Sequence, residues 1–501
     1  GVVVHLVEDE LKWLVLAFAI HDFSKNIQEQ TLVVHTRGEF RLWNFSFRQN
    51  DTIWIHPVLG EAALVPLKPE LFPEVRENRR SVCIVSLFNY GGYKNLSDRC
   101  ASVFEDKGWQ VSYAEPSKEE VERKIEEQYV TLLFSLSFSL TLSFLAMNRK
   151  IPYLCWELDK NVNPDVVNPA YISPHTYIYT TYKADVEKYI GAGANARFLP
   201  AAPNILLPES YKLSPREKEK YECDISFVGS PLITINNEYR KLKGELLEIF
   251  KGANKKEQGE IIAFNRKLDT ILEKQNRYSL KNVFRLHQIF EEEMVLLPSG
   301  ISIHLDHLKS ILAKECCRYQ RHQYLRRLDP LVVTIYGNSD WNNVNERNFR
   351  YRGEADFDYE SGKIYLASKI NIDITRVYTL DGFSDRVFNV LSRGGFLLIN
   401  RTEALSQFFE DGKELVFFDS PGDLKEKCCY YLNAEDERKE IAERGKNRVR
   451  RFHNVESRVT EMLSELDAHE GVFTAKNADL YPSIGDIVPG KKQPEVVGKL
   501  S

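Results

Sequence analysis

Short apolar runs alternate with amphipathic segments along the chain from about residue 81 onward. The runs SVCIVSLF, WQVSYAEP, YVTLLFSLS, IPYLCWELD and TYIYTTY are typical of strands, and helices or loops separate them. Strands that alternate with helices build a parallel sheet through right-handed crossovers. The pattern therefore predicts a doubly wound α/β domain over residues 81–205.

A second α/β pattern begins at CDISFVGS and resumes with LVVTIYGN, FRYRGE, INIDIT, GGFLLIN and ELVFF. A charged helical insertion interrupts it at about residues 238–327. PESYKLSPREKEKY reads as a linker between the two units, and the region from SPGDLKEK to about residue 467 reads as helical throughout. We expect a second domain over residues 206–470, an irregular tail over 471–501, and a ligand-binding cleft between the domains.

Residues 1–80 show a different mixture and no visible chemistry. ELKWLVLAFAIHDF has the pattern of a helix, while QTLVVHT, EFRLWNFSF and DTIWIHP resemble strands. This region is expected to form an accessory module that a Pro-rich, charged connection joins to the first domain.

Composition narrows the class of protein. A chain of 501 residues is too long for one core, and 43% apolar with 28% charged residues is an ordinary globular balance. The net charge of -5 argues against a dedicated nucleic-acid binder, so no nucleic acid is expected as a partner. Eight cysteines without a C-x-x-C pair indicate reduced thiols rather than a disulfide framework or a zinc site. With no signal peptide evident, these features favour a cytoplasmic protein.

One segment resembles a membrane span. TLLFSLSFSLTLSFLAM, Thr131 to Met147, is apolar but is threaded with Ser and Thr and is shorter than the roughly 20 residues that a span needs. A buried parallel strand that runs into a core helix explains it better, so no transmembrane span is expected.

Candidate ligand-binding residues follow the strands of the second domain, where open α/β sheets bind ligands. In FVGSP, Gly229 and Ser230 could offer backbone N–H groups to a phosphate, although an ordinary turn would look the same. In SKINIDITR, Lys369 and Arg376 bracket a strand.

The segment DGFSDRVFNVLSRGGFLLIN has the most suggestive chemistry. Ser384 is a plausible helix N-cap and Gly394 a plausible stop, and Asp385, Arg386 and Asn389 share one side of that helix. A solvated capping pair is one interpretation. In the other, Arg386 and the helix dipole hold a diphosphate, while the carboxylates accept hydrogen bonds from hydroxyl groups. A ligand with a diphosphate and hydroxyls is a nucleotide sugar.

Two further motifs have plainer explanations. In HLDH, His304 and His307 could approach one helical face, but a metal site would need another ligand, so no metal site is expected. RYQRHQYLRR, residues 318–327, could contact RNA or an anionic surface, but a solvated helix face accounts for it.

Several of these segments together carry a family resemblance. KINIDITR, DGFSDRVFNVLSRGGFLLIN, CDISFVGS, TIYGNSDW, IPYLCWELDK and RFLPAAPN resemble the CgeB-like (spore-maturation) branch of the group 1 glycosyltransferases. The resemblance spans about residues 81–467 and is strongest over 365–432. It implies a GT-B fold, in which two facing Rossmann-like domains transfer a sugar from a nucleotide sugar without an obligatory metal or other cofactor.

The resemblance also assigns roles to residues. It implies that Asp381 contacts the donor sugar and that Asn389 meets the ribose, where an amide replaces the family's usual carboxylate and binds a diol more weakly. Arg386 and Lys369 match positions that reach the diphosphate. The remaining donor-side positions that it implies are Gly229, Ser230, Arg240, Tyr336, Gly337, Gly382, Ser384 and Asp385.

The first domain is expected to carry the acceptor side. Glu157 and Asp159 end a strand in CWELDK, and either carboxylate could act as the general base of an inverting transferase. Carboxylates that merely cap a loop are the alternative, and a retaining enzyme needs no such base.

The sequence thus predicts a metal-independent glycosyltransferase that uses a nucleotide-diphosphate sugar, with a UDP-sugar favoured. Its acceptor could be a saccharide, a protein or a small molecule. Two alternatives remain open: a GT-B sugar-nucleotide epimerase, and a non-catalytic scaffold or coat protein, which the amide at Asn389 would favour.

Overall fold

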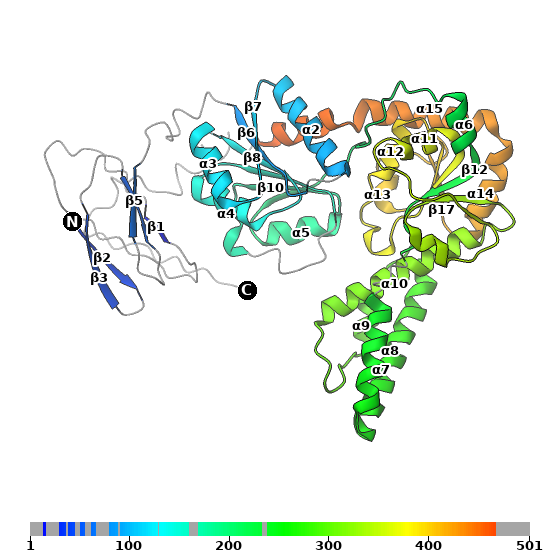
Figure 1. The fold of residues 1–501 in the computed structure, drawn as a ribbon, viewed down its shortest axis with the longest axis horizontal. Helices are drawn as coiled ribbons and strands as arrows, with labels where there is room; N and C mark the ends of the chain where they lie inside the picture. The colour runs from blue at the N-terminus through cyan, green and yellow to red at the C-terminus, as the bar shows by residue number, and fades with distance from the viewer. Residues whose placement is uncertain are drawn as a thin grey trace.

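The computed structural model of the chain describes residues 80–88, 91–128, 130–159, 169–232 and 238–466, together with the backbone of five short strands nearer the N-terminus. Two α/β domains lie beside one another, and a helical arm projects from the second (Figure 1).

The first domain is built on a six-stranded parallel sheet in the order β11-β10-β9-β8-β6-β7. Its inner strands β6, β8, β9 and β10 are buried along their whole length, as expected for a sheet that helices cover on both faces. The membrane-like segment forms buried strand β8 and core helix α4, as predicted. The elements are β6 (Ser81–Val85), α2 (Gly91–Asp106), β7 (Gln110–Ala114), α3 (Lys118–Gln128), β8 (Leu132–Leu136), α4 (Leu140–Arg149), β9 (Tyr153–Glu157), η3 (Pro169–Tyr171), β10 (Thr176–Thr180), α5 (Lys183–Gly191) and β11 (Asn195–Phe198).

The second domain repeats this plan with a parallel sheet in the order β14-β13-β12-β15-β16-β17. All of its predicted strands form, and the predicted α/β architecture of two Rossmann-like domains is confirmed. The elements are α6 (Pro215–Tyr221), β12 (Cys223–Val228), β13 (Val333–Tyr336), η4 (Ser339–Asn343), β14 (Phe349–Tyr351), α11 (Glu360–Ala367), β15 (Ser368–Asp373), η5 (Val377–Thr379), α12 (Arg386–Ser392), β16 (Leu397–Asn400), α13 (Glu403–Ser406), β17 (Val416–Phe418), α14 (Pro421–Asn433) and α15 (Glu435–Phe452).

The segment PESYKLSPREKEKY is not a linker throughout. Its second half forms α6, because Ser214 and Glu217 make a capping box and a proline occupies the first turn.

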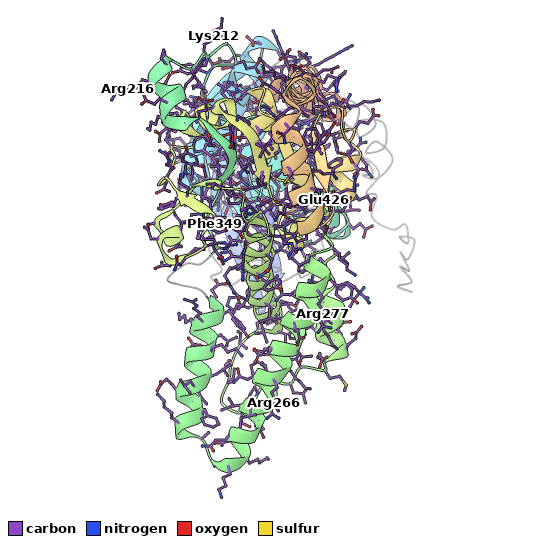
Figure 2. The ribbon with its side chains drawn as sticks, turned by 90° about the vertical axis from the view of Figure 1, so that its right-hand side faces the viewer. Lys212, Arg216, Arg266, Arg277, Phe349 and Glu426 are labelled. Atoms are coloured by element: carbon purple, nitrogen blue, oxygen red, sulfur yellow. The ribbon has the colours of Figure 1, made fainter. Side chains whose placement is uncertain are left out.

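The predicted insertion forms a separate helical arm with its own core. Apolar side chains from all four of its helices pack together, among them Leu246, Leu268, Phe290 and Leu312. Figure 2 shows Arg266 and Arg277 on the part of the arm that extends away from the two sheets. The helices are α7 (Glu238–Gly252), α8 (Lys255–Ser279), α9 (Leu286–Glu292) and α10 (Leu305–Arg326).

A last helix, over residues 455–466, returns to the first domain. Val459, Met462 and Leu466 join the core cluster that contains Leu96 and Phe134, and Figure 1 shows this helix alongside α2. The predicted boundary at residue 470 is therefore wrong for this helix, because its apolar stripe completes the core of the first domain rather than the second.

Near the N-terminus, the predicted strands form as β2 (Gln30–Thr36), β3 (Glu39–Phe45) and β4 (Asp51–Ile55). The helix predicted from ELKWLVLAFAIHDF is wrong at Leu14–Leu16, which is strand β1 and pairs antiparallel with β4. Strand β5 (Ala62–Pro66) pairs with β4 and was not predicted. A short apolar run does not distinguish strand from helix by itself.

The predicted tail over 471–501 lies outside the described residues.

All eight cysteines lie in the described part of the chain and are free thiols, as predicted. Cys429 is exposed, Cys223 is half-buried and the other six are buried. None of the helices in the described part is long and apolar enough to cross a membrane.

Candidate functional site

A cleft of about 450 Å³ opens between the two domains at the carboxyl end of β12 and β15. The chain leaves β12 toward β13 on one side, and β15 lies on the other side, so this is the point where the strand order of the second sheet reverses. Open α/β sheets bind ligands at this kind of switch point. Asp159 and Tyr182 line the cleft from the first domain, and Ser230 and Arg386 from the second.

Arg386 enters the cleft at the first turn of α12. Its Nη1 donates to Asp373 Oδ1 at 2.5 Å, and Ser384 Oγ donates to the other carboxylate oxygen at 3.0 Å. Burial alone would lower the pKa of Arg386, but the adjacent Asp373 outweighs it and raises that pKa. The N-cap is Asp385 rather than Ser384, whose hydroxyl is engaged by Asp373, while Gly394 ends the helix at a φ of 79° as predicted.

Two more guanidinium groups line the cleft. Arg321 reaches it from α10, where its Nη1 donates to the Ser230 carbonyl at 2.5 Å, and Arg376 follows β15. Neither arginine forms an ion pair within the described residues. Burial and the positive charges of Arg386 and Arg376 lower the pKa of Arg321 to about 9. A bound anion would relieve this repulsion.

The two candidate bases differ in their surroundings. Asp159 lines the cleft, and its Oδ2 accepts a hydrogen bond from the hydroxyl of Tyr93 on α2. Glu157 is only 4% exposed and its Oε2 accepts from the Phe138 N–H at 2.5 Å. Burial raises the pKa of Glu157 to about 7. Of these two carboxylates, Asp159 lines the cleft and Glu157 does not.

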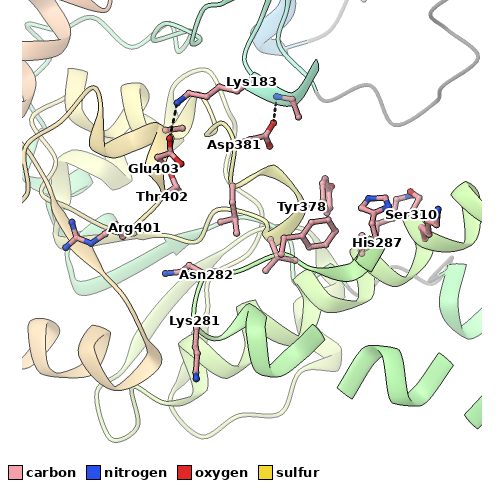
Figure 3. A pocket seen from close by; sticks show the side chains of 18 of the residues that line it. Lys183, Lys281, Asn282, His287, Ser310, Tyr378, Asp381, Arg401, Thr402 and Glu403 are labelled. Atoms are coloured by element: carbon pink, nitrogen blue, oxygen red, sulfur yellow. Dashed lines mark hydrogen bonds and ion pairs between the residues drawn. The ribbon is translucent and has the colours of Figure 1, made fainter. Parts of the chain in front are cut away.

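The other two predicted acids lie on different sides of the segment that follows β15. Asp385 lines the cleft, and burial raises its pKa although Arg386 opposes the shift. Asp381 lies in a second cavity instead, where its Oδ2 accepts from the Ala184 N–H at 3.0 Å (Figure 3).

Two of the predicted glycines lie where the backbones of two segments come close together. A Cβ at Gly337 would collide with the carbonyl of Gly229, and a Cβ at Gly382 would collide with the carbonyl of Thr181 in the first domain. Gly382 also forms a β-bridge with Tyr182, so it joins the two domains. These glycines allow the strand ends and the two domains to approach each other closely.

Besides Glu157 and Asp381, four more predicted residues lie away from the cleft. Lys369 lies at the amino end of β15, where its Nζ pairs with Asp224 at 2.7 Å. Tyr336 is 5% exposed and packs with Tyr221, and Arg240 is exposed on the helical arm. Lys369 does not reach the cleft, because the two ends of a strand lie on opposite edges of its sheet and the cleft is at the carboxyl end.

Asn389 is the fourth of these residues, and it is only 1% exposed. Its Oδ1 accepts from the Asn204 N–H at 2.9 Å, and its Nδ2 donates to the Asn204 side chain at 2.8 Å. Asn204 belongs to the segment that connects the two domains, and its side chain lines the cleft. The amide of Asn389 therefore fastens this connection rather than facing a ribose.

Sequence reasoning missed Asp373, Tyr93 and Arg321 as members of the cleft. Asp373 could have been found, because it ends the strand that Arg376 follows. Arg321 gave no signal: it belongs to the basic run that was interpreted as a solvated helix face, yet it is only 5% exposed and contacts Ser230, 91 residues earlier.

Residues 319–464 match the family model described as glycosyl transferase-like. The match covers Arg321 of α10, Arg386 of α12 and the carboxyl ends of β13, β15, β16 and β17. A search of curated proteins found no match.

The solved structures that match the chain include these three. Anabaena HepE in complex with UDP and glucose is 9% identical over 78% of this chain and 100% of its own, with a TM-score of 0.42. A glycosyltransferase from Rickettsia africae is 10% identical over 77% and 97%, with a TM-score of 0.45. BGT of phage T4 in complex with UDP-glucose is 11% identical over 77% and 98%, also with a TM-score of 0.45.

Proposed function

We propose that the chain is a glycosyltransferase that binds a nucleotide-diphosphate sugar in the cleft between its domains, with a UDP-sugar as the favoured donor. The observation that carries this proposal is the convergence of Arg321 and Arg376, two guanidinium groups without an ion pair in the described residues, on the switch point of the second sheet. Guanidinium groups match the geometry of phosphate oxygens and carry a permanent charge. The glycosyl transferase-like match over residues 319–464 supports the same assignment.

The cleft offers a role for each charged side chain. Arg321, Arg376 and Arg386 hold the diphosphate and stabilise the negative charge that develops on it as the sugar leaves. Ser384 and Asp385 lie beside Arg386 and can exchange hydrogen bonds with sugar hydroxyls. Asp373 acts through Arg386 as a positioning residue, since it holds that guanidinium by its Nη1.

Asp159 is the general base of this proposal. It faces the arginines from the first domain, and the Tyr93 hydroxyl fixes its Oδ2. As the acceptor oxygen bonds to the anomeric carbon, Asp159 takes the hydroxyl proton, and the bond from that carbon to the diphosphate breaks. This arrangement corresponds to an inverting transfer.

The test combines binding with turnover. Calorimetric titration of UDP, GDP, dTDP and CMP identifies the nucleotide, and release of nucleoside diphosphate from its sugar conjugates measures reaction. The variant Asp159→Asn keeps the size of the side chain and should slow the release of nucleoside diphosphate by about 10²–10⁴-fold with little change in nucleotide affinity. Failure of every nucleoside diphosphate to bind the folded protein would refute the proposal.

The scaffold alternative had its support in the amide at Asn389. That support weakens, because the contacts of Asn389 with Asn204 account for an amide at this position without reference to a ligand.

A further inference from the structure

A second, larger cavity of about 1120 Å³ lies beside the cleft and has no role in the function proposed above. Besides the segment that follows β15, three parts of the chain form its walls: α5 of the first domain, the arm from Lys281 to Lys314, and the loops that follow β16 and β17 (Figure 3). The segment after β15 separates the two cavities, since Arg376 and Thr379 line the cleft while Tyr378 and Leu380 line the second cavity. The volume slightly exceeds the roughly 300–1,000 Å³ that is typical of a pocket for a small molecule.

Positive charge from all three walls surrounds this cavity. Its cationic side chains are Lys183, Lys188, Lys281, Lys309, Lys314 and Arg401. Its carboxylates are Asp306, Asp381, Glu403 and Asp419.

Most of these cations are neutralised by protein partners. Lys309 pairs with Asp306 at 3.2 Å, and Arg401 pairs with Asp411 and Asp419. Lys183 and Lys314 likewise lie within 4.0 Å of a glutamate. Lys188 of α5 and Lys281 of the arm form no ion pair within the described residues. Two positive charges, one from each side of the cavity, are therefore available to an anionic ligand.

The rest of the lining suits a carbohydrate. The aromatic residues Tyr378 and Phe284 line the cavity, as do Asn282, Ser310 and Thr402, which carry short amide and hydroxyl groups. A sugar ring has an apolar face that can lie on an aromatic ring and a rim of hydroxyls that needs hydrogen-bonding partners.

We propose that this cavity binds an acidic oligosaccharide, the part of the acceptor that does not react. The proposal rests on the transferase function of the neighbouring cleft, because an acceptor must lie next to the donor. Binding energy from a remote part of a substrate can be used to position its reactive end. The role of the arm is then to supply one wall of the acceptor site.

The test uses two hexasaccharides of equal length. A hexasaccharide of alternating glucuronate and N-acetylglucosamine carries three carboxylates, and maltohexaose carries none. Calorimetry should show the acidic hexasaccharide binding the wild-type protein at least tenfold more tightly than maltohexaose. Raising the salt concentration should weaken only the acidic one. The double variant Lys188→Glu/Lys281→Glu should lose at least tenfold of the affinity for the acidic sugar.

Matched controls separate this proposal from the donor site. Lys212→Glu reverses an exposed charge on the side of the second domain away from the arm (Figure 2) and should leave the affinity for the hexasaccharide unchanged. Nucleotide affinity should survive the double lysine variant, whereas Arg376→Ala should weaken nucleotide binding and spare the hexasaccharide. Absence of acidic hexasaccharide binding, or equal binding of both sugars, would overturn the proposal even when nucleotides bind normally. Loss of nucleotide binding alone would overturn the donor assignment instead.

Discussion

At the scale of single residues, charged side chains in the cleft are held in place by hydrogen bonds to residues elsewhere in the chain. Arg321 is held by Ser230, Arg386 by Asp373, and Asp159 by Tyr93. Each pairing fixes one side chain in the orientation that a ligand would meet, which lowers the entropy lost on binding.

Lys369 and Arg376 provide a direct test of the donor site, because they bracket the same strand from opposite ends. Arg376→Ala should weaken nucleoside diphosphate binding by about 1.5–3 kcal/mol, the range for a hydrogen bond to a charged group. Lys369→Ala should leave that affinity unchanged, because Lys369 pairs with Asp224 at the other edge of the sheet. Calorimetry on both variants decides the matter, and equal affinities for the two would remove Arg376 from the site.

Asn389 is expected to contribute to stability rather than to ligand binding. Asn389→Leu removes both hydrogen bonds to Asn204 and should lower the free energy of unfolding by about 1–3 kcal/mol through the buried polar groups left unpaired. The same change at exposed Asn447 should shift it by less than about 0.5 kcal/mol. Denaturant titration measures both.

The variant Asn389→Glu distinguishes this role from the contact with a ribose that the family resemblance implies. It should also destabilise, because it buries a carboxylate against the side-chain oxygen of Asn204. A stable Asn389→Glu protein with tighter nucleotide binding would return the residue to the donor site.

Glu157 should make stability depend on pH. Burial raises its pKa in the folded state from 4.5 to about 7, so the folded state binds more protons than the unfolded state between these values. The contribution of Glu157 to the free energy of unfolding therefore becomes less favourable as the pH rises from about 4.5 to about 7. Glu157→Gln should thus be more stable than the wild type at pH 8, by on the order of 1–3 kcal/mol, and the two should converge below pH 4.5.

The control for this effect is Glu127→Gln, because Glu127 is exposed on α3. This change should shift the free energy of unfolding by less than about 0.5 kcal/mol at both pH 4.5 and pH 8. A Glu157→Gln curve parallel to that of the wild type between pH 4.5 and 8 would contradict the assignment.

At the scale of elements, the helix over residues 455–466 connects the two domains. It leaves α15 of the second domain and packs its apolar side on the sheet of the first, where Tyr179 OH also donates to Glu465 at 3.0 Å. The arm is the other distinctive element, since its own core of apolar side chains makes it a separate packing unit.

Two methionines test the role of that helix. Met462 is fully buried against the first domain, whereas Met294 on the arm is 73% exposed. Met462→Ala should reduce the free energy of unfolding by about 2–5 kcal/mol, the cost of truncating a buried large side chain. Met294→Ala should have an effect below about 0.5 kcal/mol. Equal melting temperatures for the two variants would show that the helix does not complete the core.

At the scale of the whole molecule, the two sides of the cleft meet because the two domains contact each other. The contact depends on small groups at the closest approach: Gly382 against Thr181, and Gly92, where a Cβ would collide with Phe357 of the second domain. Larger side chains at these positions would hold the domains apart.

The charge of the cleft also predicts how the proposed activity responds to metal removal. Three guanidinium groups line the cleft, and the described residues contain no group of three or more metal-ligating side chains that could hold an ion. Arginines can supply the positive charge that a metal would otherwise bring to a diphosphate. Release of nucleoside diphosphate should therefore persist in EDTA. Complete loss, with recovery on adding Mg²⁺ or Mn²⁺, would contradict this.

The sequence by itself determined the two α/β domains, the arm and the strand ends that carry the site. Buried parallel strands are apolar on both faces and amphipathic helices repeat every 3.6 residues, so both leave local patterns. Ser230, Ser384, Asp385 and Arg386 line one cleft because the carboxyl ends of parallel strands share one edge of a sheet.

Only the tertiary structure decided which side chains face the cleft. Lys369 and Arg376 bracket one strand, but the direction of the strand places them on opposite edges of the sheet. Arg321 reaches Ser230 across 91 residues, and Asn389 reaches Asn204 across 185. The helix over residues 455–466 likewise covers the sheet of the other domain. Contacts of this length leave no local pattern, because burial and pairing depend on how the elements pack and not on the residues beside them in the chain.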